Sequence, residues 1–133
     1  FFVNKISGLR KANNKIYAAS FDDGQETIVP QTLITKDIDL IRSFVEENKF
    51  DKFIVKPLDG MGGKGVVLFE RNNMGNLSSI CDFYINHTGA SQPIICQNYI
   101  EGAEKGDVRA MVVNGEPIGA IMRVPAAGDH RFL

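Results

Sequence analysis

Four glycines within the six residues from 60 to 65 form the part of the sequence whose residue types most clearly suggest chemistry. The segment reads Lys56-Pro57-Leu58-Asp59-Gly60-Met61-Gly62-Gly63-Lys64-Gly65-Val66-Val67. Without side chains, glycines let backbone N–H groups approach a phosphate closely. Lys56 stands beside this loop at the end of an apolar stretch. A lone lysine there is usually a surface residue. The adjacent loop favours a second interpretation, in which the ammonium group contacts the α- or β-phosphate of a nucleotide.

The spacing of the glycines separates several kinds of phosphate loop. The pattern G-x-G-x-x-G beginning at Gly60 occurs in dinucleotide-binding proteins, but there it precedes a helix, whereas residues 66–70 predict a strand. A P-loop requires Ser or Thr after its lysine, and Gly65 follows Lys64 here. The kinase pattern G-x-G-x-x-G-x-V matches, yet the other kinase motifs are missing from the sequence and the chain is too short. Two interpretations remain: a strand–loop–strand lid over ATP phosphates, and a hairpin turn without a ligand.

Composition excludes several classes of protein. The 133 residues carry 15 Lys and Arg against 16 Asp and Glu, a formal net charge of −1, whereas a nucleic-acid binder shows a basic excess. No apolar run approaches the ~20 residues of a membrane span, and no signal-peptide pattern opens the chain. Cys81 and Cys96 lack the spacing of a zinc site or a disulfide framework. We therefore expect a reduced, cytoplasmic protein with neither nucleic-acid nor membrane partners.

The elements that position the loop follow from apolar spacing and turn residues. Helices are predicted over residues 8–20, 36–48 and 76–87, with Thr35 as the N-cap of the second. Strands are predicted at residues 27–29, 53–55, 65–70, 93–100, 108–113 and 117–124. Asn114-Gly115 separates the last two strands and is a strong hairpin signal. This order predicts an α+β fold with one antiparallel sheet and helices packed on one face.

Several motifs together resemble those of one family. The run from Ile54 to Gly63, Ile-Val-Lys-Pro-Leu-Asp-Gly-Met-Gly-Gly, is similar to the lid of bacterial glutathione synthetases, which are ATP-grasp ligases. The same order continues with Gln97-Asn98-Tyr99-Ile100, Gly106-Asp107-x-Arg109, Val113-Asn114-Gly115-Glu116-Pro117 and Arg123-Val124-Pro125. The resemblance extends over about residues 4–131. Its most specific part is the string Asp-Gly-Met-Gly-Gly.

The resemblance implies that one group of residues binds ATP. Two lysines would contact its phosphates at the glycine lid, a strand-to-linker segment would hold adenine through backbone groups, and one acid would contact the ribose. In chain order these residues are Lys15, Lys56, Gly60, Met61, Gly62, Gly63, Gln97, Asn98, Tyr99, Ile100 and Asp107. Mg²⁺ is the second implied cofactor. Its ligands, acid and amide side chains on late strands, are expected beyond residue 133.

A second group of residues is implied to act on the substrates, γ-glutamylcysteine and glycine. Arg109, Arg123 and Arg131 match arginines near the substrate carboxylates and the transferred phosphoryl group, and Arg109 and Arg123 are the catalytic candidates. The family phosphorylates the C-terminal carboxylate of the dipeptide, and the amine of glycine then attacks the acyl phosphate. An unbroken two-residue hairpin would place Arg109 and Arg123 on opposite faces, so a shared site requires a bulge.

Domain organisation follows from the same resemblance. Residues 1–30 are predicted to form a helical connecting segment, and residues 31–133 the lid subdomain of an incomplete ATP-grasp domain without its C-terminal metal-binding half. The chain starts at Phe1 and stops at Leu133 without a capping signal, so we expect a fragment, itself inactive, of a homo-oligomeric enzyme. Two alternatives stay open. One is another ATP-grasp carboxylate–amine ligase, such as a ribosomal-protein glutamate ligase or a D-alanine–D-alanine ligase. The other is a non-catalytic nucleotide-binding module.

Overall fold

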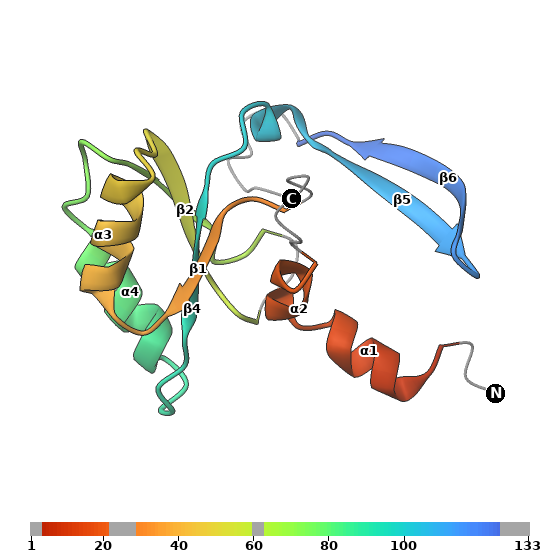
Figure 1. Ribbon diagram of the computed structural model, residues 1–133, viewed down its shortest axis with the longest axis horizontal. Helices are drawn as coiled ribbons and strands as arrows, with labels where there is room; N and C mark the ends of the chain where they lie inside the picture. Colours follow the sequence, from red (N-terminus) through yellow and green to blue (C-terminus); the bar gives the residue numbers. More distant parts are fainter. Residues whose placement is uncertain (1–3, 22–28, 60–62, 126–133) are drawn as a thin grey trace.

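A computed structural model describes residues 4–21, 29–59 and 63–125 (Figure 1). Its helices are α1 (Ile6–Ala12), α2 (Lys15–Ala19), α3 (Ile38–Glu47) and α4 (Leu77–Asn86), with a 3₁₀ turn η1 (Ala103–Lys105). Its strands are β1 (Thr32–Thr35), β2 (Lys52–Pro57), β3 (Val67–Glu70), β4 (Ile94–Asn98), β5 (Asp107–Val113) and β6 (Glu116–Arg123). None of the described helices is long and apolar enough to cross a membrane.

Four strands form an antiparallel sheet in the order β1-β4-β2-β3, and α3 and α4 cover one of its faces (Figure 1). Successive side chains of a strand point to opposite faces. Phe53 and Val55 of β2 are therefore buried against the helices, and Phe53 stacks on Phe69 with ring centroids 5.4 Å apart. Ile54 and Lys56 point to the other face. The prediction of an α+β fold with helices on one face of an antiparallel sheet is confirmed.

The sequence analysis expected the hairpin to belong to this sheet. The hairpin instead forms a separate two-stranded ribbon, β5–β6. Asn114 and Gly115 join its strands with φ values of 51° and 85°, as the hairpin prediction required. Between β4 and β5 the chain passes through η1, which is flanked by Gly102 at φ 88° and Gly106 at φ 117°. These left-handed positions turn the chain, and the ribbon extends away from the sheet (Figure 1).

Two predicted elements differ from the structure near the N-terminus. The helix expected over residues 8–20 is divided into α1 and α2, because the Asn14 side chain accepts a hydrogen bond from the Ile16 N–H (2.9 Å) and starts a new helix. A strand, β1, lies at residues 32–35, which the sequence analysis had not assigned to one; residues 27 and 28 of the expected strand 27–29 lie outside the described part of the chain.

The N-cap of α3 is Asp37 and not Thr35. The Asp37 carboxylate accepts a hydrogen bond from the Asp39 N–H (2.9 Å), whereas Thr35 ends β1 and its hydroxyl accepts one from the Asp37 N–H (3.0 Å). The run Thr-Leu-Ile-Thr is rich in β-branched residues and pairs with β4, so the extended conformation continues to Thr35. The boundary at residue 30 between a connecting segment and a lid subdomain stays a prediction.

Candidate functional site

A cavity of about 330 Å³ lies on the face of the sheet opposite α3 and α4. Figure 1 shows α2 on this side of the sheet. Helix α2, strands β2 and β4 and the segment that leads into η1 supply its walls. The floor is apolar because Ile54 of β2 and Ile95 of β4 point to this face. The remaining lining residues are Lys15, Ala18, Ala19, Val29, Pro30, Lys56, Gln97, Asn98, Tyr99, Ile100 and Ala103.

Lys15 and Lys56 bring two ammonium groups to this cavity from different elements. Lys56 points to the cavity because it follows Ile54 by two residues on β2, and Lys15 is the first residue of α2. The Lys15 Nζ donates a hydrogen bond to the carbonyl oxygen of Pro57 (3.2 Å), which ties α2 to the end of β2. The cavity therefore has a cationic end next to the segment that begins at Pro57.

The electrostatics of the two lysines indicate that the cavity is suited to an anion. Burial lowers the pKa of Lys56, and the charge of Lys15 lowers the pKa further. Burial also lowers the pKa of Lys15, while the carboxylate of Asp59 partly restores it. Partial burial thus destabilises the charged form of each ammonium group, and the two positive charges repel each other. A phosphate group between them would stabilise both charges and offset their repulsion.

Residues 97–100 follow β4 along the cavity wall. Gln97 is directly opposite Thr32 of β1, and its Nε2 donates to the Thr32 hydroxyl (2.6 Å). By strand alternation the Asn98 side chain starts towards the other face. Its Oδ1 is buried and has no hydrogen-bond partner among the described residues. The Tyr99 hydroxyl donates to the Glu104 carboxylate (2.7 Å).

Of the residues implied to bind ATP, the structure brings Lys15, Lys56 and the segment from Gln97 to Ile100 together in one cavity. Gly63 is described but is not among the lining residues; its φ is 70° and its carbonyl oxygen accepts a hydrogen bond from the Val66 N–H (3.3 Å). Gly60, Met61 and Gly62 lie outside the described residues, as does Arg131. The roles of all these residues stay predictions.

The ribbon carries the other predicted site residues, and a bulge decides which face they occupy. The pairing shifts between Met111 and Val112, leaving Ile118 as the extra residue of β6. Beyond the shift Asp107 is opposite Arg123 and Arg109 is opposite Ile121. The hairpin is therefore not unbroken, and the bulge that a shared site would require is present. Asp107, Arg109 and Arg123 share one face.

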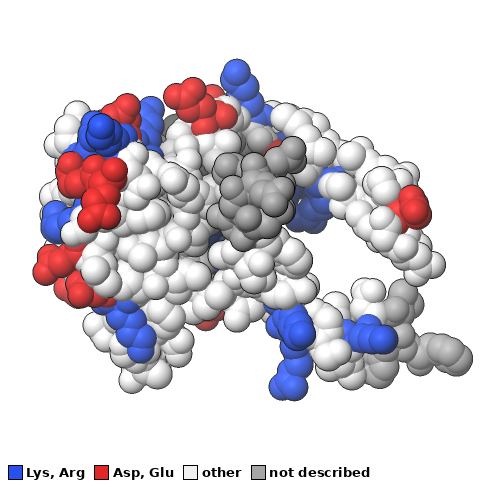
Figure 2. Space-filling view, viewed as in Figure 1, with Lys and Arg blue, Asp and Glu red and all other residues white. Residues whose placement is uncertain are grey.

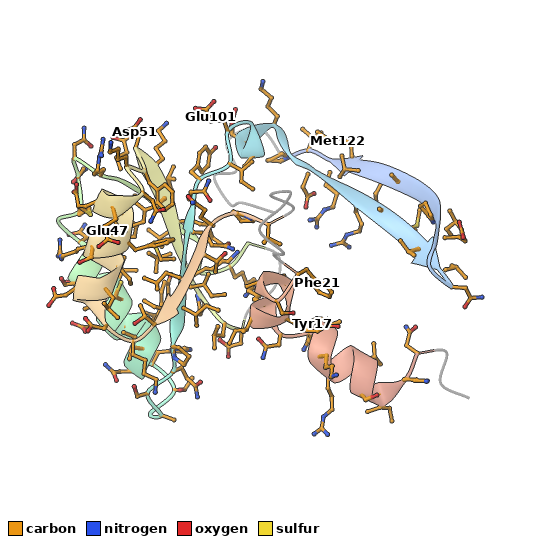
Figure 3. The ribbon with its side chains drawn as sticks, viewed as in Figure 1. Tyr17, Phe21, Glu47, Asp51, Glu101 and Met122 are labelled. Carbon is orange, nitrogen blue, oxygen red and sulfur yellow. The ribbon has the colours of Figure 1, made fainter. Side chains whose placement is uncertain are left out.

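Figure 2 shows basic side chains on the side of the ribbon that is turned towards α2, and Arg109 and Arg123 are the Lys or Arg residues of β5 and β6. Met122, one residue earlier than Arg123, lies on the opposite, outer side (Figure 3). Arg123 donates from its Nε (2.7 Å) and from its terminal nitrogen to the two carboxylate oxygens of Asp107. This pair lowers the pKa of the Asp107 carboxyl.

The resemblance assigned Asp107 to the ribose and Arg123 to the substrate, but the structure pairs the two with each other. Neither residue lines the cavity. A contact from either residue to a ligand in the cavity would therefore require the ribbon to move towards the cavity. It would also require the ligand to compete with the Asp107–Arg123 ion pair or to bind beside it.

Two features of the site were missed by the sequence analysis although the sequence contained a signal for each. The apolar floor follows from strand alternation, because a residue two positions before Lys56 or before Gln97 shares its face. The bulge had a signal in Pro117, since proline cannot donate to a strand ladder and is found at bulges and edges.

The described residues do not fit a metal centre. Across residues 4–21, 29–59 and 63–125, no three His, Cys, Asp or Glu side chains form a group that could hold a metal ion. The magnesium ligands expected beyond residue 133 stay a prediction.

Comparisons with known proteins show what this chain is similar to. The profile described as "Prokaryotic glutathione synthetase, ATP-grasp domain" matches residues 14–132. Glutathione synthetases of Agrobacterium fabrum and Thermosynechococcus vestitus are 40% and 36% identical over 129 residues, which is 97% of this chain and 38% of each relative. The chain thus spans about 38% of the length of these curated relatives.

A solved structure shares the fold. The crystal structure of the D-cycloserine synthetase DcsG superimposes with a TM-score of 0.66, over 80% of this chain and 36% of that one. The two sequences are 21% identical, so this likeness concerns the fold alone.

Proposed function

Because this chain belongs to the prokaryotic family of glutathione synthetase ATP-grasp domains, we propose that it is the ATP-binding part of a ligase that joins γ-glutamylcysteine to glycine. The observation that carries this proposal is the pair of ammonium groups, from Lys15 and Lys56, at one end of a largely apolar cavity. An apolar slot with a cationic end suits a nucleotide, whose base is flat and whose phosphates are anionic.

In the proposed reaction the γ-phosphoryl group of ATP is transferred to the C-terminal carboxylate of γ-glutamylcysteine. The amine of glycine then attacks the acyl phosphate, forms the peptide bond and releases phosphate. Phosphoryl transfer depends mainly on positioning and on neutralising charge. Lys15 and Lys56 would supply positive charge to the phosphates of ATP, and residues 97–100 would hold adenine through their backbone. We place this reaction, with Mg²⁺ as its metal, in the cytoplasm.

The ribbon would bind the dipeptide substrate. Arg109 and Arg123 share the face turned towards α2, where the two carboxylates of the dipeptide would require cationic groups. The Asp107 carboxylate accepts hydrogen bonds from the Arg123 guanidinium on the neighbouring strand. In this proposal Arg109 meets a carboxylate directly, and Arg123 does so when Asp107 turns to the ribose.

The proposal is tested at Lys56, whose side chain Lys56→Met replaces with an uncharged one of similar length. Loss of one charge-assisted phosphate contact costs about 1.5–3 kcal/mol, so the affinity for ATP, measured by calorimetry, should fall roughly tenfold to a hundredfold. Lys36→Met is the matched control, because the Lys36 ammonium donates to the Ser91 carbonyl and lies outside the cavity. Equal affinities of Lys56→Met and wild type would contradict the proposal.

The substrate is tested separately, by phosphate release from ATP with the intact protein. Release that requires both γ-glutamylcysteine and glycine supports the proposed ligase. Release with D-alanine instead would favour a different carboxylate–amine ligase, and ATP binding without any release would favour a nucleotide-binding module.

A further inference from the structure

Three groups form a short hydrogen-bond relay beside the cavity. The Thr32 hydroxyl donates to the carbonyl oxygen of Pro30 (2.7 Å), and the same hydroxyl accepts from the Gln97 Nε2 (2.6 Å). Thr32 and Gln97 are directly opposite each other on β1 and β4, so both side chains stand on one face of the sheet. Pro30 and Gln97 line the cavity, whereas Thr32 is not among its lining residues.

The relay determines which atom of the Gln97 amide, Nε2 or Oε1, faces Thr32. A carbonyl oxygen can only accept, so the hydroxyl proton of Thr32 is committed to Pro30. The hydroxyl oxygen must then accept, and the amide group that meets it must be the donor, Nε2. Gln97 consequently turns its carbonyl oxygen, Oε1, away from Thr32. The orientation of an amide is often ambiguous, but here it follows from the hydrogen-bonding chemistry of the partners.

The Gln97 amide lies where it could form a hydrogen bond with the edge of a bound base. Gln97 shares its face with Ile95, two residues earlier, and with Ile54, its partner on β2; both are part of the apolar floor. Lys56 lies further along the same face and marks the end of the cavity suited to phosphates. A flat base on the floor would therefore present its edge to the Gln97 amide.

We propose that Thr32, acting through Gln97, makes this cavity selective for a 6-amino purine over a 6-oxo purine. The inference rests on the proposed function, that the cavity binds a purine nucleotide. Oε1 of Gln97 accepts a hydrogen bond from the 6-amino group of adenine. A 6-oxo purine presents an acceptor at that position, and two acceptors facing each other leave both unpaired. Thr32 is thus a positioning residue, and Gln97 is the residue that contacts the base.

The test compares ADP with IDP, whose phosphates are the same. Their bases differ in the 6-amino or 6-oxo group and at N1, which accepts a hydrogen bond in ADP and carries a proton in IDP. Calorimetry on the intact protein should give a dissociation constant for ADP at least about tenfold below that for IDP. Thr32→Val keeps the shape of the side chain and its preference for strands but removes the hydroxyl. The amide is then free to rotate and to present Nε2, so the ratio of the two dissociation constants should fall at least about threefold. Backbone contacts of residues 97–100 would keep the rest of the preference.

Two variants separate positioning from a general structural effect. Thr32→Ser restores the hydroxyl and should restore the preference for ADP. Thr35→Val removes the other hydroxyl of β1, which accepts from the Asp37 N–H outside the cavity, and should leave the preference unchanged. If circular dichroism shows that Thr32→Val is unfolded, Gln97→Met replaces it as the variant in which the ratio of the two dissociation constants falls.

The outcomes distinguish this inference from the function on which it rests. Equal affinity of the wild type for ADP and IDP would overturn the inference and leave the nucleotide site standing. Equal weakening of both nucleotides by Thr32→Val, with the preference retained, would also overturn it, because that is the effect of a purely structural hydroxyl. Failure of the wild type to bind either nucleotide would overturn both the inference and the proposed function.

Discussion

The four-stranded sheet and the β5–β6 ribbon are both antiparallel, yet they are stabilised in different ways. Phe53, Val55 and Cys96 of the sheet are completely buried beneath α3 and α4. In the ribbon Val108 is 65% exposed and Met122 is 56% exposed, and none of its residues is buried. The sheet therefore derives its stability from its own core, whereas a two-stranded ribbon without one is marginally stable.

This difference shows where each half of the proposed site gets its rigidity. The cavity with Lys15 and Lys56 is held by a packed sheet. The arginines of the ribbon depend on the two ends of a hairpin: the turn at Asn114-Gly115, and the root at which Gly106 and Asp107 meet Arg123. Such a ribbon can open locally at a low free-energy cost.

The largest expected effect comes from the core. Phe53→Ala removes a fully buried ring that stacks on Phe69 and should lower the free energy of unfolding by about 3–5 kcal/mol. Met122→Ala, the matched truncation in the ribbon, should change it by less than about 0.5 kcal/mol. Urea denaturation of both variants measures the contrast. Similar losses in the two would mean that the ribbon packs against the core.

The second effect concerns the root of the ribbon. A Cβ at Gly106 would overlap the carbonyl oxygen of Arg123, and the φ of 117° already disfavours a side chain. Gly106→Ala should therefore speed amide hydrogen exchange throughout β5 and β6 and leave β2 and β4 protected.

Gly115→Ala at the other end of the ribbon is the comparison for that variant. The φ there is 85°, but the space around the new Cβ is open, so only the conformational cost of roughly 1–2 kcal/mol applies. Its exchange should rise less than that of Gly106→Ala. Unchanged exchange of the ribbon in Gly106→Ala would show that the root does not control it.

A third, smaller effect is expected from the ion pair at the root. Asp107→Asn keeps the shape of the side chain and removes the charge that holds Arg123. Amide exchange of Val108 and Met122 should rise, with the unfolding midpoint of the protein unchanged. Asp51→Asn is the control, since it breaks the exposed Arg71–Asp51 pair of the sheet and should leave the ribbon as it was. A large fall in the unfolding midpoint of Asp107→Asn would mean that the pair supports the core.

Sequence reasoning succeeded where local pattern and burial act together. Helices α3 and α4 lie close to their predicted ranges, because the apolar residues spaced along one side of each are the ones that the sheet buries. Asn114-Gly115 likewise specifies its own turn, because both residues tolerate positive φ.

Sequence reasoning failed where a single bulge or a left-handed glycine changes the register or the direction of the residues that follow it. The bulge at Ile118 moves the register of the ribbon by one position, which reverses the faces of the arginines and places Arg123 against Asp107. Gly102 and Gly106 turn the ribbon out of the sheet through left-handed conformations that strand patterns do not reveal. The relay from Gln97 to Pro30 depends on strand β1, and that strand was not predicted.

The smallest expected effect is a dependence of stability on pH that belongs to the sheet. Burial, and then the charge of Lys15, lowers the pKa of Lys56 below its usual 10.5. Between that lowered value and 10.5 the unfolded chain binds more protons than the native protein, so the free energy of unfolding rises with pH. At neutral pH the charged Lys56 destabilises the native state. Lys56→Met should therefore be more stable than the wild type at pH 7, and this advantage should shrink as the pH approaches 10.5.

Urea denaturation at pH 7 and near pH 10.5 measures this change, with Met122→Ala as the control because it alters no titratable group. The ribbon variant should differ from the wild type by the same small amount at both pH values. The same Lys56→Met protein should bind ATP more weakly, since the charge that destabilises the empty cavity is the one proposed to hold a phosphate. An advantage of Lys56→Met that stays constant up to pH 10.5 would show that the ammonium group is well solvated. In that case the charge of Lys56 would not destabilise the empty cavity, and a bound nucleotide would have no such destabilisation to offset. The sheet and the ribbon would then differ in packing alone.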